Sequence, residues 1–266
     1  MNEKKVAVVT GGTSGIGRGT ALALKDAGCT VYELSRRAEG VEGLRHISAD
    51  VTDESAVNAA VAQVIAAEGQ IDILVNNAGF GISGAIEFTS TTDARSLFDV
   101  NFFGMVNMNR AVVPLMRAAG HGRIVNLSSV AAPVPIPFQA YYSATKAAVN
   151  AYTMALANEL RPFGVTVCAV MPGDIHTGFT AARRKLSEGD DFYQGRISRS
   201  VVRMEHDEQT GMDPAKAGAY IAKVALRSGS NHPLYAIRFD YKFFAFLAKV
   251  LPARFLNWLI YLLYGK

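Results

Sequence analysis

The sequence predicts a single-domain α/β fold in which a doubly wound, mostly parallel sheet of seven strands is covered by helices on both faces. Short runs rich in β-branched residues alternate with stretches of ten or more residues at helical spacing, a pattern typical of a parallel sheet. The first run, residues 6–10, is followed by a glycine-rich turn and a helical stretch. With 266 residues, 50% of them apolar, the chain can bury one continuous core.

The composition limits the partners and the compartment. The formal net charge is +4 and the basic residues are scattered, so acidic ligands such as phosphates are permitted but nucleic acid is not expected. Cys29 and Cys168 lie within or beside apolar runs, which indicates buried thiols in a reducing compartment. Residues 1–5 lead into only five strand-like residues, so we expect no signal peptide and a cytoplasmic protein. No Cys and His spacing indicates a metal site.

Seven apolar runs have the length of strands. They cover residues 6–10, 31–35, 44–49, 71–75, 123–127, 165–170 and 234–239. Helices are expected over residues 18–27, 53–68 and 214–226, in two segments within 83–117 of which the second starts near Asp99, and from Tyr142 onward. Asp213 followed by Pro214 is a typical N-cap and first helical residue.

A glycine-rich turn, residues 11–17, connects the first strand to the first helix. Such a turn lets the backbone approach a pyrophosphate, and the helix N-terminus supplies free N–H groups and the positive end of a dipole. Glycines also serve tight turns that bind no ligand, so the turn alone is weak evidence. Its place directly after an N-terminal strand favours a dinucleotide-binding Rossmann fold.

The end of the second strand indicates which dinucleotide binds. It reads Ser35-Arg36-Arg37, where this fold usually places an acid on the adenosine ribose. A hydroxyl and guanidinium groups can bind the 2′-phosphate of NADP, whereas a carboxylate would repel it, so NADP is favoured over NAD. Two alternatives stay open: the arginines are solvated loop charges, or Glu33 reaches the ribose. Asp50, at the end of the third strand, can meet the adenine amino group.

Polar side chains stand at the carboxyl ends of the fourth and fifth strands, where open α/β sheets bind ligands. Asn76 and Asn77 can hold neighbouring backbone through side-chain hydrogen bonds, and residues 78–79, Ala-Gly, leave room for a ligand. A simple Asn-rich turn is the alternative. Ser128 and Ser129 follow the fifth strand.

Tyr142 and Lys146 lie one helical turn apart, so the phenol and the ammonium group project from the same face of a helix. A cation close to a tyrosine lowers the phenol pKa from its ordinary value of about 10 toward the working pH. The pair is therefore a candidate proton donor. Taken alone, the same spacing also fits an ordinary aromatic residue beside a solvated lysine.

Together these motifs resemble the pattern of the short-chain dehydrogenase/reductase family, in order and spacing, over about residues 5–180. The matching elements are Thr10-Gly11-x-x-x-Gly15-Ile16-Gly17, Asn76-Asn77-Ala78-Gly79, Asn101, Ser129, Tyr142-x-x-x-Lys146 and Pro172-Gly173. The resemblance implies a catalytic tetrad of Asn101, Ser129, Tyr142 and Lys146, with Ser129 rather than Ser128 at the matching distance from the tyrosine. The cofactor-binding residues that it implies are Gly11, Thr13, Ser14, Gly15, Ile16, Gly17, Ser35, Arg36, Arg37, Asp50, Val51, Asn77, Ala78, Gly79, Tyr142, Lys146, Pro172, Gly173, Ile175 and Thr177.

The resemblance also implies a reaction. A hydride would pass between NADP(H) and a carbonyl carbon while Tyr142 exchanges a proton with the substrate oxygen, which Ser129 would hydrogen-bond. Lys146 would bind the nicotinamide ribose and lower the tyrosine pKa, and Asn101 would hold a water that connects Lys146 to solvent. Pairing of the helices at Asp99 and Tyr142 across subunits would give a homodimer or homotetramer.

The substrate class is less defined. Apolar residues flank the motifs and favour a bulky apolar substrate: they are Phe80, Ile82, Val134, Ile136, Phe138 and Phe179. The run that starts at Pro172, Pro-Gly-Asp-Ile-His-Thr-Gly-Phe, is similar to hydroxysteroid and retinol dehydrogenases, which implies a steroid-, retinoid- or lipid-like alcohol or ketone. Small or acyl-chain ketones stay open, because the same residues could belong to the core.

Two other classes of protein are weighed against an active reductase. A catalytically silent, cofactor-binding sensor or scaffold would not need the complete tetrad. Nucleotide-sugar epimerases have a similar tyrosine and lysine, but they need an extra substrate domain, and only about 90 residues follow Pro172.

Two C-terminal segments carry no motif. Acidic and basic residues balance over 181–208, so residues 178–212 are expected to form a mobile, solvated substrate lid. Residues 243–264 are rich in Phe, Leu, Trp and Tyr, but charged residues and Pro252 interrupt them, so no bilayer span is expected. We expect this amphipathic tail to pack on the domain, on a partner subunit or on the substrate cleft. Contact with a membrane surface is the alternative.

Overall fold

A computed structural model describes residues 4–227, 229 and 231–266; the expectation about the extreme N-terminus falls partly on residues 1–3, outside the described residues. The described chain forms a seven-stranded sheet in the order β3-β2-β1-β4-β6-β7-β9, in which every pairing is parallel. The strands are β1 Val6–Thr10, β2 Thr30–Ser35, β3 Arg45–Ser48, β4 Ile73–Asn76, β6 Gly122–Leu127, β7 Val165–Met171 and β9 Leu234–Ala236. The predicted fold class is confirmed.

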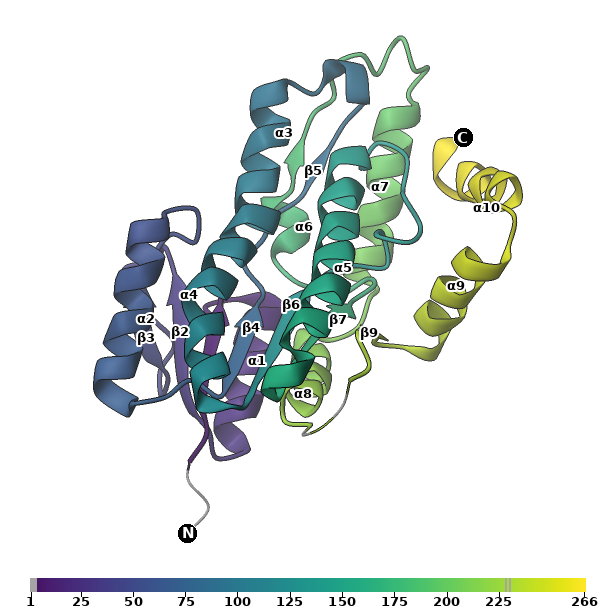
Figure 1. Cartoon of the computed structure of the whole chain (residues 1–266). Coiled ribbons are helices and arrows are strands. Elements are labelled where there is room, and N and C mark those ends of the chain that lie inside the picture. The colour runs from purple at the N-terminus through teal and green to yellow at the C-terminus, as the bar shows by residue number, and fades with distance from the viewer. Residues whose placement is uncertain (1–3, 228, 230) are drawn as a thin grey trace.

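Helices cover both faces of the sheet (Figure 1). One face carries α1 Gly15–Asp26 and α8 Pro214–Ala225, and the other carries α2 Glu54–Glu68, α4 Gly104–Ala119 and α5 Ala140–Leu160. Because both faces are covered, the central strands are buried along most of their length, as β1 shows with five buried residues. The strand order reverses between β1 and β4, and that point is where sheets of this kind open a crevice.

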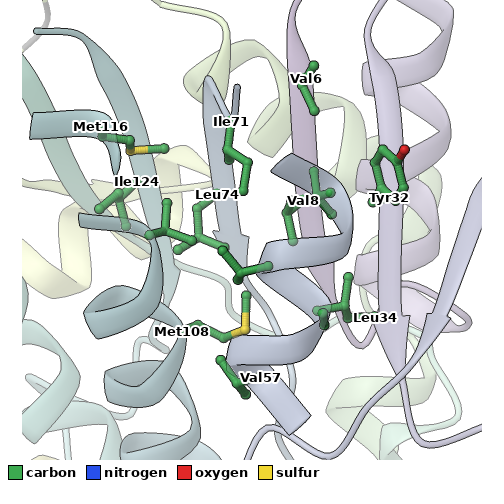
Figure 2. Close-up of a cluster of buried hydrophobic side chains, with 14 of the residues drawn as sticks. Val6, Val8, Tyr32, Leu34, Val57, Ile71, Leu74, Met108, Met116 and Ile124 are labelled. Atoms are coloured by element: carbon green, nitrogen blue, oxygen red, sulfur yellow. The ribbon is translucent and has the colours of Figure 1, made fainter. Parts of the chain in front are cut away.

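Figure 2 shows buried side chains of the core cluster on the α2, α4 and α5 face. Val8 and Leu74 from neighbouring strands pack against Val57 of α2 and against Met108 and Met116 of α4. These side chains are fully buried, so each contributes about 1.5–3 kcal/mol of hydrophobic free energy to folding. The packing fixes the strand ends from which the functional loops leave.

A polar network lies inside this apolar layer. The side-chain amide of Asn76 donates to Asn109 Oδ1 and to Asn126 Oδ1, both at 2.9 Å, and Asn126 Nδ2 donates to Thr153 Oγ1 at 3.0 Å. These buried bonds connect β4, β6, α4 and α5. Asn76 therefore has a structural role, whereas its neighbour Asn77 serves the loop described below.

The region predicted as two helices within residues 83–117 is more segmented. It contains the 3₁₀ turn Ile86–Phe88, α3 Thr91–Phe98, a π-helical turn Asp99–Phe103 and α4. The π turn joins α3 to α4 without a break, so the second helix starts later than the predicted Asp99.

The segment expected to form a mobile, solvated substrate lid has regular secondary structure. Residues 178–212 contain α6 Phe179–Ala182, strand β8 Arg184–Lys185 and α7 Arg196–Gln209. Strand β8 pairs with β5, Ile82–Ser83, in a second small parallel sheet. Ile197, Ser200 and Met204 recur at helical spacing and are buried, so α7 packs this side inward, whereas Arg199 and Arg203 are exposed.

The C-terminal tail forms two helices and a final turn. These are α9 Phe239–Val250, α10 Ala253–Ile260 and a π-helical turn over Tyr261–Gly265. The strand predicted over 234–239 ends at Ala236, because α9 begins three residues later. Figure 1 shows α9 and α10, in yellow, outside the layers of the sheet and its covering helices. Within the described residues, no helix is long and apolar enough to cross a membrane.

Candidate active site

The loop after β1 has a backbone shape that needs glycine. Gly11 and Gly15 have φ angles of 65° and 52°, in the left-handed region that other residues disfavour. A Cβ on Gly17 would lie 2.3 Å from the Gly11 carbonyl oxygen and 2.4 Å from Asn77 Nδ2. The start of α1 is therefore pressed against the loop backbone and against the end of β4.

The N-terminus of α1 can receive an anion. Ser14 is the N-cap, but its side chain makes no capping hydrogen bond, and the first turn contains no acidic residue. The first-turn N–H groups and the positive end of the helix dipole are therefore unopposed by a side-chain anion. Thr13, Ser14, Gly15 and Ile16 all line the main cleft. This arrangement fits the pyrophosphate of a dinucleotide.

Asn77 holds the glycine loop in place. Its Nδ2 donates to the carbonyl oxygens of Thr10 and Gly11 at 3.0 and 3.2 Å. In return, Thr10 Oγ1 accepts from the backbone N–H groups of Asn77 and Ala78, both at 3.0 Å. The loops after β1 and β4 are thus joined into one rigid unit at the topological switch point.

The end of β2 has two differently placed arginines. Arg37 lines the cleft, whereas Arg36 Nη1 lies 3.9 Å from Asp50 Oδ2. The Ser35 hydroxyl oxygen is buried and finds no hydrogen-bond partner among the described residues. Asp50 Oδ1 is occupied by the backbone N–H and the hydroxyl of Thr52. Arg37 therefore offers a cation to the cleft, whereas the unsatisfied Ser35 hydroxyl lies off the cleft wall.

Glu33 has a different role from the one that the sequence left open. It is fully buried, does not line the cleft, and hydrogen-bonds His46 Nδ1 through Oε1. The other ring nitrogen of His46 lies 2.9 Å from the Arg37 carbonyl oxygen. Oε1 of Glu33 is thereby committed to His46, whereas Oε2 is buried without a hydrogen-bond partner among the described residues. Through His46 it fixes the loop that carries Arg37.

Asn101 lies on the π-helical turn and is buried behind the cleft rather than on its wall. Its amide accepts from the Phe80 N–H and donates to the Phe80 carbonyl oxygen, both at 2.9 Å, and also donates to Thr145 Oγ1 at 3.3 Å. A Cβ built on Gly79 would be 3.0 Å from Asn101 Oδ1 and 3.8 Å from Lys146 Nζ. Asn101 and Lys146 thus border the same space beside Gly79.

Helix α5 brings Tyr142 and Lys146 together near Ser129. Lys146 Nζ donates to the Leu127 carbonyl oxygen at 2.8 Å and lies 5.7 Å from the centre of the Tyr142 ring. The Ser129 side chain lies near the Tyr142 phenol and acts to lower its pKa. The neighbouring Ser128 donates to the Lys146 carbonyl oxygen at 3.0 Å, so its hydroxyl is committed to the helix backbone. The geometry therefore agrees with the choice of Ser129 over Ser128.

The two ionisable groups have shifted pKa values. Burial raises the pKa of Tyr142 to about 12, although the nearby Ser129 side chain and the Arg183 charge act against that shift. Burial lowers the pKa of Lys146 to about 8. The sequence-based expectation that the lysine brings the phenol pKa toward neutrality is therefore not met, because burial dominates. At neutral pH the phenol keeps its proton and can donate it.

A buried ion pair lies beside the phenol. Arg183 pairs through Nη2 with Glu208 Oε1, and Glu208 Oε2 accepts from Thr180 Oγ1 at 2.6 Å. Arg183 Nη1 is buried without a partner among the described residues. The Arg183 guanidinium stacks 5.6 Å from the Phe179 ring, which lies 5.8 Å from the Tyr142 ring. This end of the cleft is therefore both polar and aromatic.

The tail reaches the same end of the cleft. Tyr241 donates to Asp174 Oδ2 at 2.7 Å and accepts from the Asp174 N–H at 2.9 Å. Tyr264 lines the cleft and donates to Asp207 Oδ2 at 3.2 Å. Sequence reasoning missed the Arg183–Glu208 and tyrosine contacts, because their partners are far apart in the chain and match no local pattern.

Many of these groups line one cleft of about 390 Å³, which extends from the glycine loop to Tyr264. The predicted residues that line it are Gly11, Thr13, Ser14, Gly15, Ile16, Arg37, Asn77, Ala78, Gly79, Ser129, Tyr142, Lys146, Pro172, Gly173, Ile175 and Thr177. Those off its walls are Gly17, Ser35, Arg36, Asp50, Val51 and Asn101. Of the flanking apolar residues, Phe80, Ile136 and Phe179 line it, and Ile82, Val134 and Phe138 do not.

Comparison with known proteins gives a consistent set of relatives. A sequence profile described as short chain dehydrogenase matches residues 5–188. A 3-ketodihydrosphingosine reductase from Bacteroides thetaiotaomicron is 41% identical over 228 residues, which cover 85% of each protein. A short-chain dehydrogenase from Streptomyces avermitilis superposes with a TM-score of 0.83 at 34% identity and covers 92% of both chains.

Two further solved structures contain a nicotinamide cofactor. ElxO with NADP bound has a TM-score of 0.75 at 27% identity, covering 90% of this chain and 99% of that one. A 3-ketoacyl-(acyl-carrier-protein) reductase from Brucella melitensis, complexed with NADH, has a TM-score of 0.74 at 27% identity, covering 88% of this chain and 97% of that one. Relatives of this fold thus include structures with either cofactor.

Proposed function

The chain belongs to the short-chain dehydrogenase/reductase family of oxidoreductases with nicotinamide cofactors, and we propose that it transfers a hydride between NADP(H) and the carbonyl or secondary alcohol of an amphipathic, lipid-like substrate. The observation that carries the proposal is the meeting of Tyr142, Ser129 and Lys146 in one cleft with the α1 N-terminus. The cleft therefore contains a proton donor, a group that can hydrogen-bond the substrate oxygen, and a site for an anion.

The chain's own residues have distinct tasks in this proposal. The cofactor supplies or accepts the hydride when it is bound. Tyr142, which keeps its proton because of burial, donates it to the carbonyl oxygen during reduction, and Ser129 hydrogen-bonds the same oxygen. Lys146 binds the ribose hydroxyls next to Gly79. Asn101 fixes the Phe80 backbone and holds the water that links Lys146 to solvent.

The choice of NADP over NAD is supported by the end of β2. Arg37 faces the cleft, the Ser35 hydroxyl is unsatisfied, and Glu33 is committed to His46 below. A 2′-phosphate would gain charge-assisted hydrogen bonds there, whereas the ribose hydroxyl of NAD would gain little. Within the part of the chain that the structure describes, no carboxylate of β2 lines the cleft, which supports NADP over NAD.

The substrate class is supported by the mixed character of the cleft. Phe80, Ile136 and Phe179 suit an apolar chain or ring system, while the buried pair of Arg183 and Glu208 suits a polar substituent close to the carbonyl. A purely apolar ketone would leave Arg183 Nη1 without a partner. The relative named for 3-ketodihydrosphingosine acts on a ketone of this kind, in which a long chain carries an amino alcohol beside the keto group.

A panel of ketones tests the function, with the loss of NADPH absorbance as the readout. It includes a long-chain 2-amino-3-ketone, the plain 3-ketone of the same length, a steroid ketone, a retinoid and a short acyl-chain ketone. We expect the highest kcat/KM with the amino ketone, and with NADPH rather than NADH. If the short acyl-chain ketone gave the highest kcat/KM, the protein would instead be assigned as a reductase of small or acyl-chain ketones. Tight NADPH binding without turnover of any ketone would identify a silent cofactor-binding protein.

Two features of the working enzyme are also proposed. The helices α4 and α5 pair across a subunit interface and give a homodimer or homotetramer, for which sedimentation equilibrium is the measurement. The free thiols of Cys29 and Cys168 are both buried, which supports a reducing, cytoplasmic setting.

A further inference from the structure

The C-terminal tail, residues 239–265, carries more than half of the large apolar side chains that are exposed among the described residues. Of the fourteen large apolar side chains that are exposed among the described residues, eight lie in the tail: Phe243, Phe244, Phe246, Val250, Phe255, Trp258, Tyr261 and Leu263. In α9, Phe243, Phe246 and Val250 recur at helical spacing, and in α10 the rings of Phe255 and Trp258 lie 5.7 Å apart. Such a concentration on one segment marks an interaction surface.

The charge of the tail is equally uneven. From Arg238 to Lys266 there are five basic residues, Arg238, Lys242, Lys249, Arg254 and Lys266, and one acidic residue, Asp240. This excess equals the whole net charge of the chain, +4, so residues 1–237 are formally neutral. Lys242, Lys249 and Arg254 are exposed among the aromatic side chains. The exposed tail is therefore both apolar and cationic.

The other side of the tail is tied to the protein. Tyr241 bonds to Asp174, Tyr264 bonds to Asp207, and Ile260 is buried. Arg196 Nη1 also donates to the Gly265 carbonyl oxygen at 3.5 Å. These contacts hold the inner side of the helices on the cleft, so the aromatic side chains stay directed outward.

We propose that α9 and α10 dock the protein on the surface of an anionic lipid membrane. Phe, Trp and Tyr partition into the headgroup region, and Lys and Arg next to them meet anionic headgroups with their charged ends. The helices are too short to span the bilayer and lie in its surface. A second copy of the chain fits this surface less well than a membrane does. A symmetric interface would place the cationic tail of one copy against the cationic tail of the other.

Docking would bring the cleft to the lipid surface. Tyr264 and Gly173, against which Tyr241 packs, both line the cleft, so the tail lies at its substrate end. A long-chain substrate dissolved in the membrane could then enter without crossing water. This consequence rests on the proposed function, whereas docking itself does not and can be measured without turnover.

Trp258 is the single tryptophan of the chain, so its fluorescence reports directly on the tail. The full-length protein is titrated with vesicles of phosphatidylcholine alone and of phosphatidylcholine mixed with phosphatidylglycerol. With the anionic vesicles we expect a blue shift of the emission, quenching by brominated acyl chains, and co-sedimentation about tenfold stronger than with neutral vesicles. High salt should weaken the binding.

Variants separate the two components of the surface. Phe246→Gln with Phe255→Gln removes two exposed rings and keeps Trp258, and Lys249→Glu with Arg254→Glu reverses two charges. Each pair should weaken vesicle binding about tenfold and leave NADPH-dependent turnover of a water-soluble ketone unchanged. Phe192→Gln, a substitution of the most exposed aromatic residue outside the tail, is the control and should bind vesicles like the wild type.

Three results would overturn the proposal. These are failure of the wild-type protein to bind either kind of vesicle, equal binding by the tail variants, and a change of oligomer size in those variants without any vesicle binding. The last result would assign the surface to a second copy of the chain.

Discussion

At one end of the cleft, the side chains of Asn77 and Thr10 bind the backbone of the loops after β1 and β4. At the other end, Arg183 pairs with Glu208, and Tyr264 donates to Asp207. The first end is formed by residues adjacent to two neighbouring strands. The second combines α6, α7 and the C-terminal turn. The cofactor end is therefore fixed by the sheet itself, and the substrate end by contacts between distant segments.

This difference indicates which residues can be exchanged at each end of the cleft without loss of the fold. A backbone cradle recognises a constant group such as a pyrophosphate and tolerates almost no added atom, since a Cβ on Gly17 already overlaps backbone. A pocket of long side chains can exchange residues without disturbing the sheet, so specificity can change there while the cofactor stays. Tyr142 lies where the two ends meet.

The largest effect is expected at that meeting point. Tyr142→Phe removes the proton donor but keeps the ring and its contact with Phe179, so kcat should fall by roughly 100-fold to 10,000-fold. The dissociation constant of NADPH should change little. The matched control is Tyr141→Phe, which should keep wild-type turnover. Near-native rates in the Tyr142 variant would remove the tyrosine from the chemistry.

The cofactor end should respond to a single methyl group. Gly17→Ala forces a Cβ against the Gly11 carbonyl and Asn77, at a cost of about 1 to 3 kcal/mol in unfolding free energy, with weaker NADPH binding. Gly178→Ala at the substrate end is the control, because a Cβ there meets no atom within 4 Å. Thermal unfolding measures both variants. If Gly17→Ala melted at the same temperature as the wild type, the glycine loop would be able to relax around the added methyl group.

Cofactor preference should depend more on Arg37 than on Arg36. A charge-assisted hydrogen bond to the 2′-phosphate contributes about 1.5 to 3 kcal/mol, which corresponds to roughly 10-fold to 100-fold preference for NADP. Arg37→Ala should remove most of it, Arg36→Ala less because Asp50 attracts that side chain, and Ser35→Asp should reverse it. Titrations of the wild type and of the three variants with NADP and with NAD measure this preference. Tighter NAD binding by the wild type would refute the assignment.

The fold and the cofactor end could be predicted because their constraints are local. Gly11, Gly15 and Asn77 lie next to strands that apolar runs already identify, and the 142–146 spacing sets one helix face. Arg183 and Glu208 could not be paired from sequence, since α7 had to be placed first. One available signal was overlooked there: Ile197, Val201 and Met204 have helical spacing within the charged stretch. The pKa of Tyr142 depends on burial, which the i, i+4 pattern does not report.

The smallest effect is a pH dependence from Lys146. Its pKa near 8 means that the ammonium charge is present at pH 7 and is lost above pH 8, while Tyr142 stays protonated throughout. Ketone reduction should be level below about pH 7 and decline above pH 8 by up to about tenfold per pH unit. Since the folded state binds this proton less tightly than the unfolded chain, the same group increases stability as pH rises from about 8 toward 10.5.

Lys146→Arg keeps a charge at all these pH values and should abolish the decline, whatever its effect on the absolute rate. The pH profile of kcat/KM is the measurement. A transition in the wild type near pH 10 would mean that the lysine keeps its ordinary proton affinity.

The independence of the two ends is tested most directly by a double variant, Arg183→Met with Glu208→Met. Replacing a buried ion pair by apolar residues of similar size is often neutral or stabilising, so the protein should fold. The measurement is the ratio of kcat/KM for a long-chain 2-amino-3-ketone to that for the plain 3-ketone, with the NADPH dissociation constant taken on the same sample. The account predicts that this ratio falls by about tenfold or more while NADPH affinity stays within about twofold. An unchanged ratio, or a loss of NADPH affinity as large as the loss of turnover, would contradict it.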